Sequence, residues 1–181
     1  MIFLSTPVII AILLVCMLVV LQSQRDEARS CDAIVVAPQQ QIQQEQLDHA
    51  LSLYRQGYAP HLLIRGIDTD TARALEQKYD LPEGTILIVE SGQYRPLQQV
   101  AQLAYQHGIQ RIILVDRPAS MLLALKMAGD LELEGYGAPL PDTPLRADEV
   151  LRASLDYWSY IFFGSSAPCC YSIRSQTGRT T

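Results

Sequence analysis

The residues best suited to chemistry lie in the short segment "DRPAS", residues 116–120, which comes directly after the apolar run Ile112–Val115. Asp116, Arg117 and Ser120 bring a carboxylate, a guanidinium and a hydroxyl within five residues. An acid and a base at a strand end can bind a polar ligand, or they can form a local ion pair. A serine becomes a nucleophile only beside a base, and the sequence places no histidine next to this one.

The surrounding pattern predicts the elements that must position this segment. Short apolar, β-branched runs alternate with segments that have apolar residues at helical spacing, which indicates βαβ units and a parallel sheet. The predicted strands are residues 33–36, 61–66, 85–90, 111–115 and 131–137. The predicted helices are residues 46–57, 70–79, 96–108, 120–130 and 147–163. We therefore expect an α/β fold with a doubly wound, mostly parallel five-stranded Rossmann-like sheet.

Ligands of open α/β sheets bind beyond the carboxyl ends of the strands, where the strand order reverses. Polar residues at these ends are the candidate ligand-binding residues. For Asp68 or Thr69 the favoured role is to cap the next helix. The candidates are Arg65, Gly66, Asp68, Glu90, Arg95, Asp116, Arg117 and Ser120. The histidines His49, His61 and His107 are interpreted as structural or surface residues, because the pattern places none of them at such a strand end.

The N-terminal segment predicts membrane attachment. Residues Ile2–Leu21 carry no charge, and about 20 helical residues match the hydrocarbon thickness of a bilayer. A cleavable signal peptide is the alternative, but no basic residue precedes the run and no good cleavage site comes after it. We expect residues 1–24 to form a single transmembrane anchor. Arg25 and Arg29 favour a cytoplasmic location for the rest of the chain.

Composition excludes some classes of function. The net charge of −5 and the lack of basic runs argue against nucleic-acid binding. The four cysteines, Cys16, Cys31, Cys169 and Cys170, have no metal-type spacing, so no metal site is predicted and no cofactor can be assigned. Residues 165–181 have the composition of a loose C-terminal tail.

The order of these motifs resembles the YdcF/SanA/ElyC-like family, a Rossmann-like family of domains of unknown function. The similar pieces are "CDAIVV", "LDHALSLYRQGYAPHLLIRG", "IILVDRPASMLLALKMAGDLELEGYGAPLP" and "LRASLDYWSYIFFG", which together define a domain over residues 31–164. The resemblance implies an N-terminal anchor in the inner or plasma membrane, a role in cell-envelope biogenesis and an extracytoplasmic domain.

The chain departs from the family pattern at the positions expected to do chemistry. The glycine-rich loop after the first strand is replaced by "APQQQIQQEQ", and glutamine does not adopt glycine's backbone geometry cheaply. Pro118, Met121 and Ala124 match the family, but Ser120 stands at its histidine position and Leu123 at its arginine position. Glu90 corresponds to the family's acid after the third strand, while Arg95 or Gln98 falls where its second glutamate would be.

These departures leave two functions open. The first is a membrane-anchored binding or scaffold module with lost catalytic motifs, which takes a small anionic ligand or an envelope precursor. The alternative is an active envelope enzyme on an anionic or nucleotide-like substrate, with Glu90, Asp116, Arg117 and Ser120 as a rearranged site. Whether the protein is an enzyme stays open at this point.

The last predicted helix has an apolar stripe of Leu151, Leu155, Trp158 and Phe162. We expect this stripe to pack on the sheet and complete the core. The alternative is an amphipathic helix that rests on the bilayer, which its aromatic residues would suit.

Overall fold

The computed structural model describes residues 5–23, 29–36, 43–89, 96–141, 143 and 145–163. Its helices are α1 (Ser5–Ser23), α2 (Gln44–Arg55), α3 (Thr69–Tyr79), α4 (Pro96–Gln106), α5 (Pro118–Asp130) and α6 (Ala147–Phe163). Its strands are β1 (Ala33–Val36), β2 (His61–Arg65), β3 (Ile86–Val89), β4 (Arg111–Asp116) and β5 (Glu134–Pro139).

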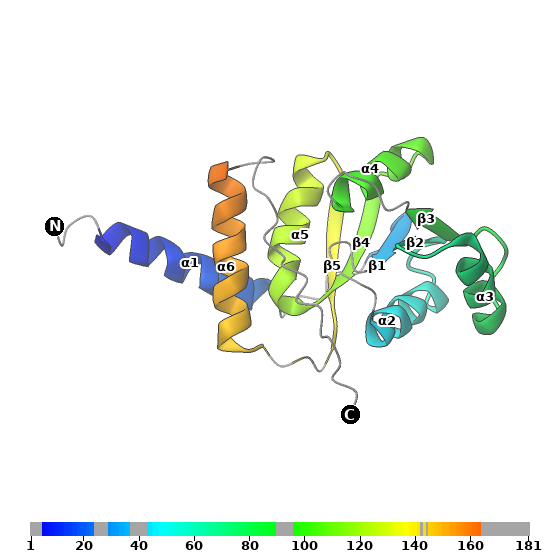
Figure 1. Ribbon diagram of the computed structural model, residues 1–181, viewed down its shortest axis with the longest axis horizontal. Helices are drawn as coiled ribbons and strands as arrows, with labels where there is room; N and C mark the ends of the chain where they lie inside the picture. The colour runs from blue at the N-terminus through cyan, green and yellow to red at the C-terminus, as the bar shows by residue number, and fades with distance from the viewer. Residues whose placement is uncertain are drawn as a thin grey trace, which may run out of the picture.

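The five strands form one parallel sheet in the order β3-β2-β1-β4-β5. The chain builds outward from β1 to β3, then crosses back through α4 to place β4 on the other side of β1 (Figure 1). The prediction of a doubly wound, Rossmann-like sheet is confirmed. The predicted last strand begins three residues too early, because Leu131 and Glu132 form the turn that ends α5.

Helices cover both faces of the sheet. Ile34 and Val36 of β1 pack with α2 and α3 on one face, while Ala33 and Val35 pack with α4 and α5 on the other. Successive side chains of a strand point to opposite faces, so a strand with both faces covered must be apolar throughout. This explains the uninterrupted apolar runs in the sequence.

Glu76 of α3 is a buried acid with a structural role. Its Oε1 accepts the buried backbone N–H of Ile86, the first residue of β3, at 3.0 Å. Glu76→Ala should therefore lower the free energy of unfolding by about 1–3 kcal/mol, because the Ile86 N–H loses its acceptor. Glu76→Gln keeps an acceptor oxygen and should be far closer to the original protein in a denaturant titration. Equal losses for both variants would contradict this assignment.

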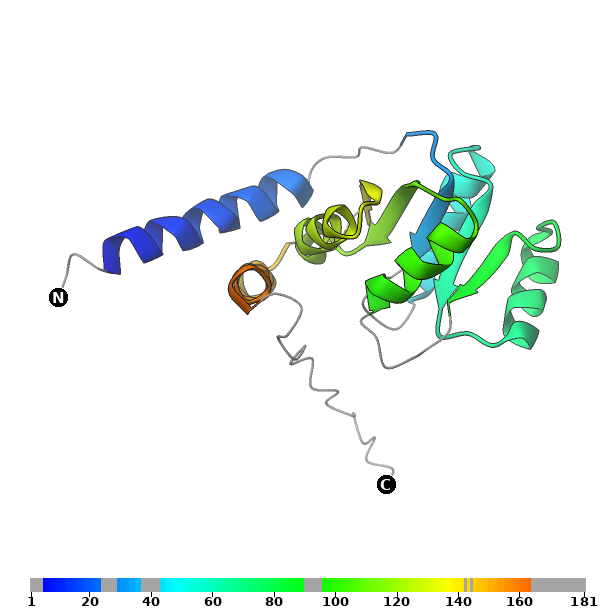
Figure 2. The same cartoon turned by 90° about the horizontal axis from the view of Figure 1, so that it is seen from above.

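Helix α1 lies against α5 and α6 (Figure 2). Val15 and Val19 are buried there, and the Sγ of Cys16 lies 3.2 Å from the Oγ of Ser154 on α6. Among the described residues, no helix combines the length and the apolar character required to cross a bilayer. The predicted anchor over residues 1–24 includes positions outside the described part of the chain, and it stays a prediction.

The prediction that the apolar stripe of α6 packs on the sheet is wrong. Leu151 and Leu155 are 50% and 52% exposed, and Phe162 is 71% exposed. Helix α5 already covers that face of β4 and β5, so α6 packs outside it, against α5 and α1. The face that α6 buries there contains the fully buried Ser154, whose small side chain allows the close approach of α1.

Candidate ligand-binding site

The strand order reverses between β1 and β4, because the chain leaves β1 for α2 on one face and leaves β4 for α5 on the other. Parallel strands place their carboxyl ends at one edge of the sheet, and the crevice at such a reversal is where ligands of this architecture bind. Val36 and Asp116 end these two strands. Asp116 is therefore positioned at the switch point by the fold itself.

The Asp116 side chain is completely buried, and only one of its carboxyl oxygens is satisfied by the residues described. Oδ1 accepts the backbone N–H of Arg117 at 2.7 Å and the Nε2 group of Gln46 at 3.4 Å. Oδ2 has no hydrogen-bond partner within the described residues. A buried polar atom without a partner costs free energy, which makes Oδ2 the atom of this site that a ligand could satisfy.

Burial raises the pKa of Asp116 from 3.8 to about 6. The hydrogen bond from the Arg117 N–H, the nearby Ser120 hydroxyl and the charge of Arg117 act in the opposite direction, but they only partly offset the loss of hydration. The carboxyl group can therefore gain or lose a proton near neutral pH.

Gln46 is a site residue that the sequence pattern did not single out. It lies fully buried in the first turn of α2, where its Oε1 accepts the backbone N–H of Gln43 at 3.0 Å. That bond orients the amide so that Nε2 points to Asp116. No feature of the helical pattern around Gln46 indicates this role.

Arg117 and Ser120 form the turn that begins α5. Arg117 is the N-cap residue, Pro118 occupies the first helical position, and the Ser120 hydroxyl donates to the Arg117 carbonyl at 3.0 Å. Proline suits this position because a backbone N–H at the first helical residue has no partner within the helix, so its absence costs nothing. The structure thus brings Asp116, Arg117 and Ser120 together, as the sequence predicted.

The candidates on β2 and β3 lie apart from this group. Arg65 ends β2, and its Nε donates to the Oε1 of Gln99 on α4 at 3.1 Å. Asp68 caps α3, accepting the Thr71 N–H at 2.9 Å. The Thr71 side chain and this N–H together lower the pKa of the exposed Asp68 carboxyl. Gly66 adopts a φ of 78° at the strand end, which favours glycine. Glu90 and Arg95 lie outside the described residues.

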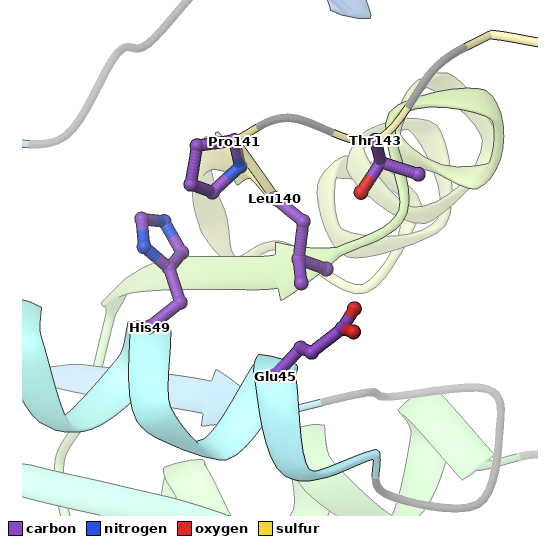
Figure 3. Close-up of a pocket in the computed structure, with 5 residues that line it drawn as sticks. All are labelled: Glu45, His49, Leu140, Pro141 and Thr143. Carbon is purple, nitrogen blue, oxygen red and sulfur yellow. The ribbon is translucent and has the colours of Figure 1, made fainter.

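A hollow of about 350 Å³ adjoins the switch point. Glu45 and His49 of α2 face Leu140, Pro141 and Thr143, which come after β5 (Figure 3). The backbone N–H of Leu140 donates to the Asp116 carbonyl at 3.2 Å, so the wall of the hollow is joined to the Asp116 backbone. The sequence led us to expect His49 to be a structural or surface residue. Its place in the wall of the hollow could not be predicted, because helical spacing does not reveal which strand ends a helix faces.

The described residues contain no group of three His, Cys, Asp or Glu side chains that could hold a metal ion. Comparison with protein-family models, curated proteins and solved structures gave no significant match.

Replacing Ser120 by alanine should change the free energy of unfolding by at most about 1 kcal/mol, since its hydroxyl donates a partly exposed hydrogen bond to the Arg117 carbonyl and only partly offsets the burial of the Asp116 carboxyl. Chemical denaturation of the two proteins side by side measures this difference. A loss of several kcal/mol would mean that the hydroxyl has a structural partner beyond the Arg117 carbonyl.

Proposed function

We propose that this protein is a membrane-held α/β domain that binds a small polar ligand of the cell envelope at its switch point. In this proposal it is a divergent relative of the YdcF/SanA/ElyC-like family that keeps the family's fold and has lost its catalytic groups. The domain acts as a binding or scaffold module on the extracytoplasmic side of the inner or plasma membrane.

One observation carries the ligand-binding part of the proposal: the buried Oδ2 of Asp116 has no partner among the described residues. The other carboxyl oxygen, Oδ1, accepts hydrogen bonds from Arg117 and Gln46, so the side chain is oriented before any ligand binds. Preorganisation of this kind reduces the entropic cost of binding. A ligand hydroxyl or amine that donates to Oδ2 would satisfy the atom.

The state of Ser120 supports binding over catalysis. A serine nucleophile needs its hydroxyl proton removed by an adjacent base. The Ser120 hydroxyl instead donates to the Arg117 carbonyl, which is a turn contact and cannot take up a proton. The arrangement is that of a helix start. The Asp116 carboxyl beside this hydroxyl is the base on which the enzyme alternative below depends.

The apolar character of α1 supports attachment to a membrane. Seven of its large apolar side chains are exposed although the helix packs on α5 and α6. Soluble proteins rarely expose a continuous apolar surface of this kind. Lipid would cover it.

An enzyme is the second candidate function, and the pKa of Asp116 favours it. General acids and bases work best when their pKa lies near the working pH, and burial is a common way to bring a carboxyl group there. A pKa of about 6 would let Asp116 act in this way on a substrate bound beside it.

Both candidates are tested on the full-length protein in detergent, incubated with nucleotides and with soluble cell-wall precursors. We expect a saturable rise in melting temperature with no product detected by mass spectrometry. Asp116→Asn, which replaces the Oδ2 acceptor by a donor, should abolish the rise. Asp70→Asn, a matched change of an exposed acid in the first turn of α3, should preserve it. Product formation that Asp116→Asn removes would overturn the binding module in favour of the enzyme.

A further inference from the structure

The outer side of the molecule carries an apolar surface made by two helices, which we call the α1–α6 face. Its members are large apolar side chains that remain exposed in the folded chain. They are Ile10, Leu13, Leu14, Met17, Leu18, Val20 and Leu21 of α1 with Leu151, Leu155, Ile161 and Phe162 of α6. The two helices pack against each other, so these exposed side chains lie on adjoining elements.

The α6 part of this face is amphipathic. Leu151, Leu155, Trp158 and Phe162 succeed one another at intervals of four, three and four residues, which places them on one stripe of the helix. The Trp158 and Phe162 rings stack with their centroids 5.2 Å apart. The stripe is thus a formed surface with an aromatic end, and the rest of the described fold leaves Leu151, Leu155 and Phe162 exposed.

The two helices cross. Figure 1 shows α1 running outward from the domain behind α6, and Figure 2 shows α6 end-on while α1 extends sideways. A membrane that holds α1 therefore comes close to α6, whose long axis does not run along that of α1. Such an arrangement lets α6 lie along the membrane surface while α1 attaches the chain.

We propose that α6 is a second membrane contact, which lies in the bilayer interface with its Leu151–Phe162 stripe among the lipid chains. The inference rests on the proposed membrane attachment by α1. Lipid is the favoured occupant because the stripe lies on the helix that adjoins α1, whose exposed apolar surface requires the same cover. Trp158, within the stripe, is of a type enriched at membrane interfaces.

The charges of α6 define the kind of membrane that it binds. Its polar side carries Asp148, Glu149 and Asp156 against the single basic residue Arg152. Binding of α6 therefore depends on the burial of apolar area and not on attraction to anionic headgroups. It should occur on neutral phosphatidylcholine and should persist at high salt.

Trp158 is the only tryptophan of the chain, so its fluorescence reports on α6 alone. The full-length protein is reconstituted in phosphatidylcholine vesicles with or without brominated acyl chains, which quench tryptophan only at close range. We expect the brominated chains to remove most of the Trp158 emission, with no change in 0.5 M salt, a concentration at which the screening length falls to roughly 4 Å. The double variant Leu151→Gln, Leu155→Gln should recover the emission. Arg152→Gln, on the same helix and with the same new side chain, should not.

Flotation of the same samples separates this inference from the proposed attachment. If the unaltered protein does not float with the vesicles, attachment through α1 fails and the α6 contact fails with it. If the protein floats but brominated lipid leaves Trp158 unquenched, the α6 contact alone is overturned. Crosslinking of two copies through α6, lost in the double variant and accompanied by unquenched Trp158, would show that the stripe binds a second copy of the chain.

Discussion

Asp116→Asn should raise the free energy of unfolding at pH 7 by up to about 3 kcal/mol, and it should flatten the dependence of stability on pH between about 4 and 7. The Asp116 carboxyl titrates at 3.8 when exposed and at about 6 in the folded protein. Each pH unit by which a pKa moves corresponds to roughly 1.4 kcal/mol, which sets the size of the effect. The asparagine amide has nearly the same shape, and its oxygen can still accept from Arg117 and Gln46. Its buried amide nitrogen takes the place of the unpartnered Oδ2, and this offsets part of the gain.

The direction of the effect is set by proton binding. Between pH 3.8 and about 6 the folded state holds a proton on Asp116 that the unfolded state has lost. Stability therefore falls as the pH rises through this window, and the full cost of the buried charge is present above the folded pKa. Below pH 3.8 both states are protonated and the cost vanishes. The variant has no proton to lose, so it escapes the cost at every pH.

Urea unfolding of both proteins from pH 3.5 to 8 measures the difference directly, because the contributions of all other titrating groups cancel between them. The two proteins should be nearly equal in stability at the acid end, should diverge from about pH 4, and should differ most above the folded pKa of about 6. A difference in stability that stays constant from pH 3.5 to 8 would contradict the raised pKa of Asp116.

Gly135→Val should lower the free energy of unfolding by about 1–3 kcal/mol, because it overfills the contact between β5 and α5. A Cβ atom at Gly135 would lie 3.2 Å from the Cβ of Ala128 and 3.2 Å from the Cδ2 of Leu125. The Ala128 Cβ is fixed to the backbone of α5 and can yield only if the helix moves. The two further methyl groups of valine add to this crowding.

Gly129→Ala is the matched control, because it also adds a side chain to a glycine near this contact. A Cβ there meets no atom within 4 Å, and alanine in a helix restricts the unfolded chain. It should therefore stabilise the protein by roughly 0.4–1 kcal/mol. Thermal unfolding of the two variants should give shifts of opposite sign. Equal stability of Gly135→Val and the original protein would contradict the close packing of α5 on β5.

The sheet was predictable because its central strands are buried on both faces. Ile112–Val115 has no polar residue, and such a run between two helical segments is typical of a strand buried on both faces. The same pattern placed Asp116, Arg117 and Ser120 at one of four strand ends, and only the strand order of the structure makes this end the switch point. The pattern could not give the chemistry of Asp116, because the pKa of this carboxyl depends on burial, and burial depends on how α2 and β5 pack around it.

Two parts of the structure could not be predicted from the sequence. Gln46 stands within an ordinary helical pattern, and only the three-dimensional arrangement brings its amide to Asp116. The apolar stripe of α6 was expected in the core because apolar stripes of helices usually pack inward. Helix α5, however, already covers this face of the sheet and leaves Leu151 and Leu155 exposed.

The proposal that the domain works at a membrane is tested most directly by fractionation of cells that make the full-length protein. Membranes are washed with carbonate, which strips proteins that are bound only at the periphery, and the intact mass of the retained protein is then measured. We expect full-length protein in the washed membranes, with residues 2–21 present. Recovery in the soluble fraction of a protein that starts near residue 25 would contradict the proposal, because the apolar segment would then be a removed leader.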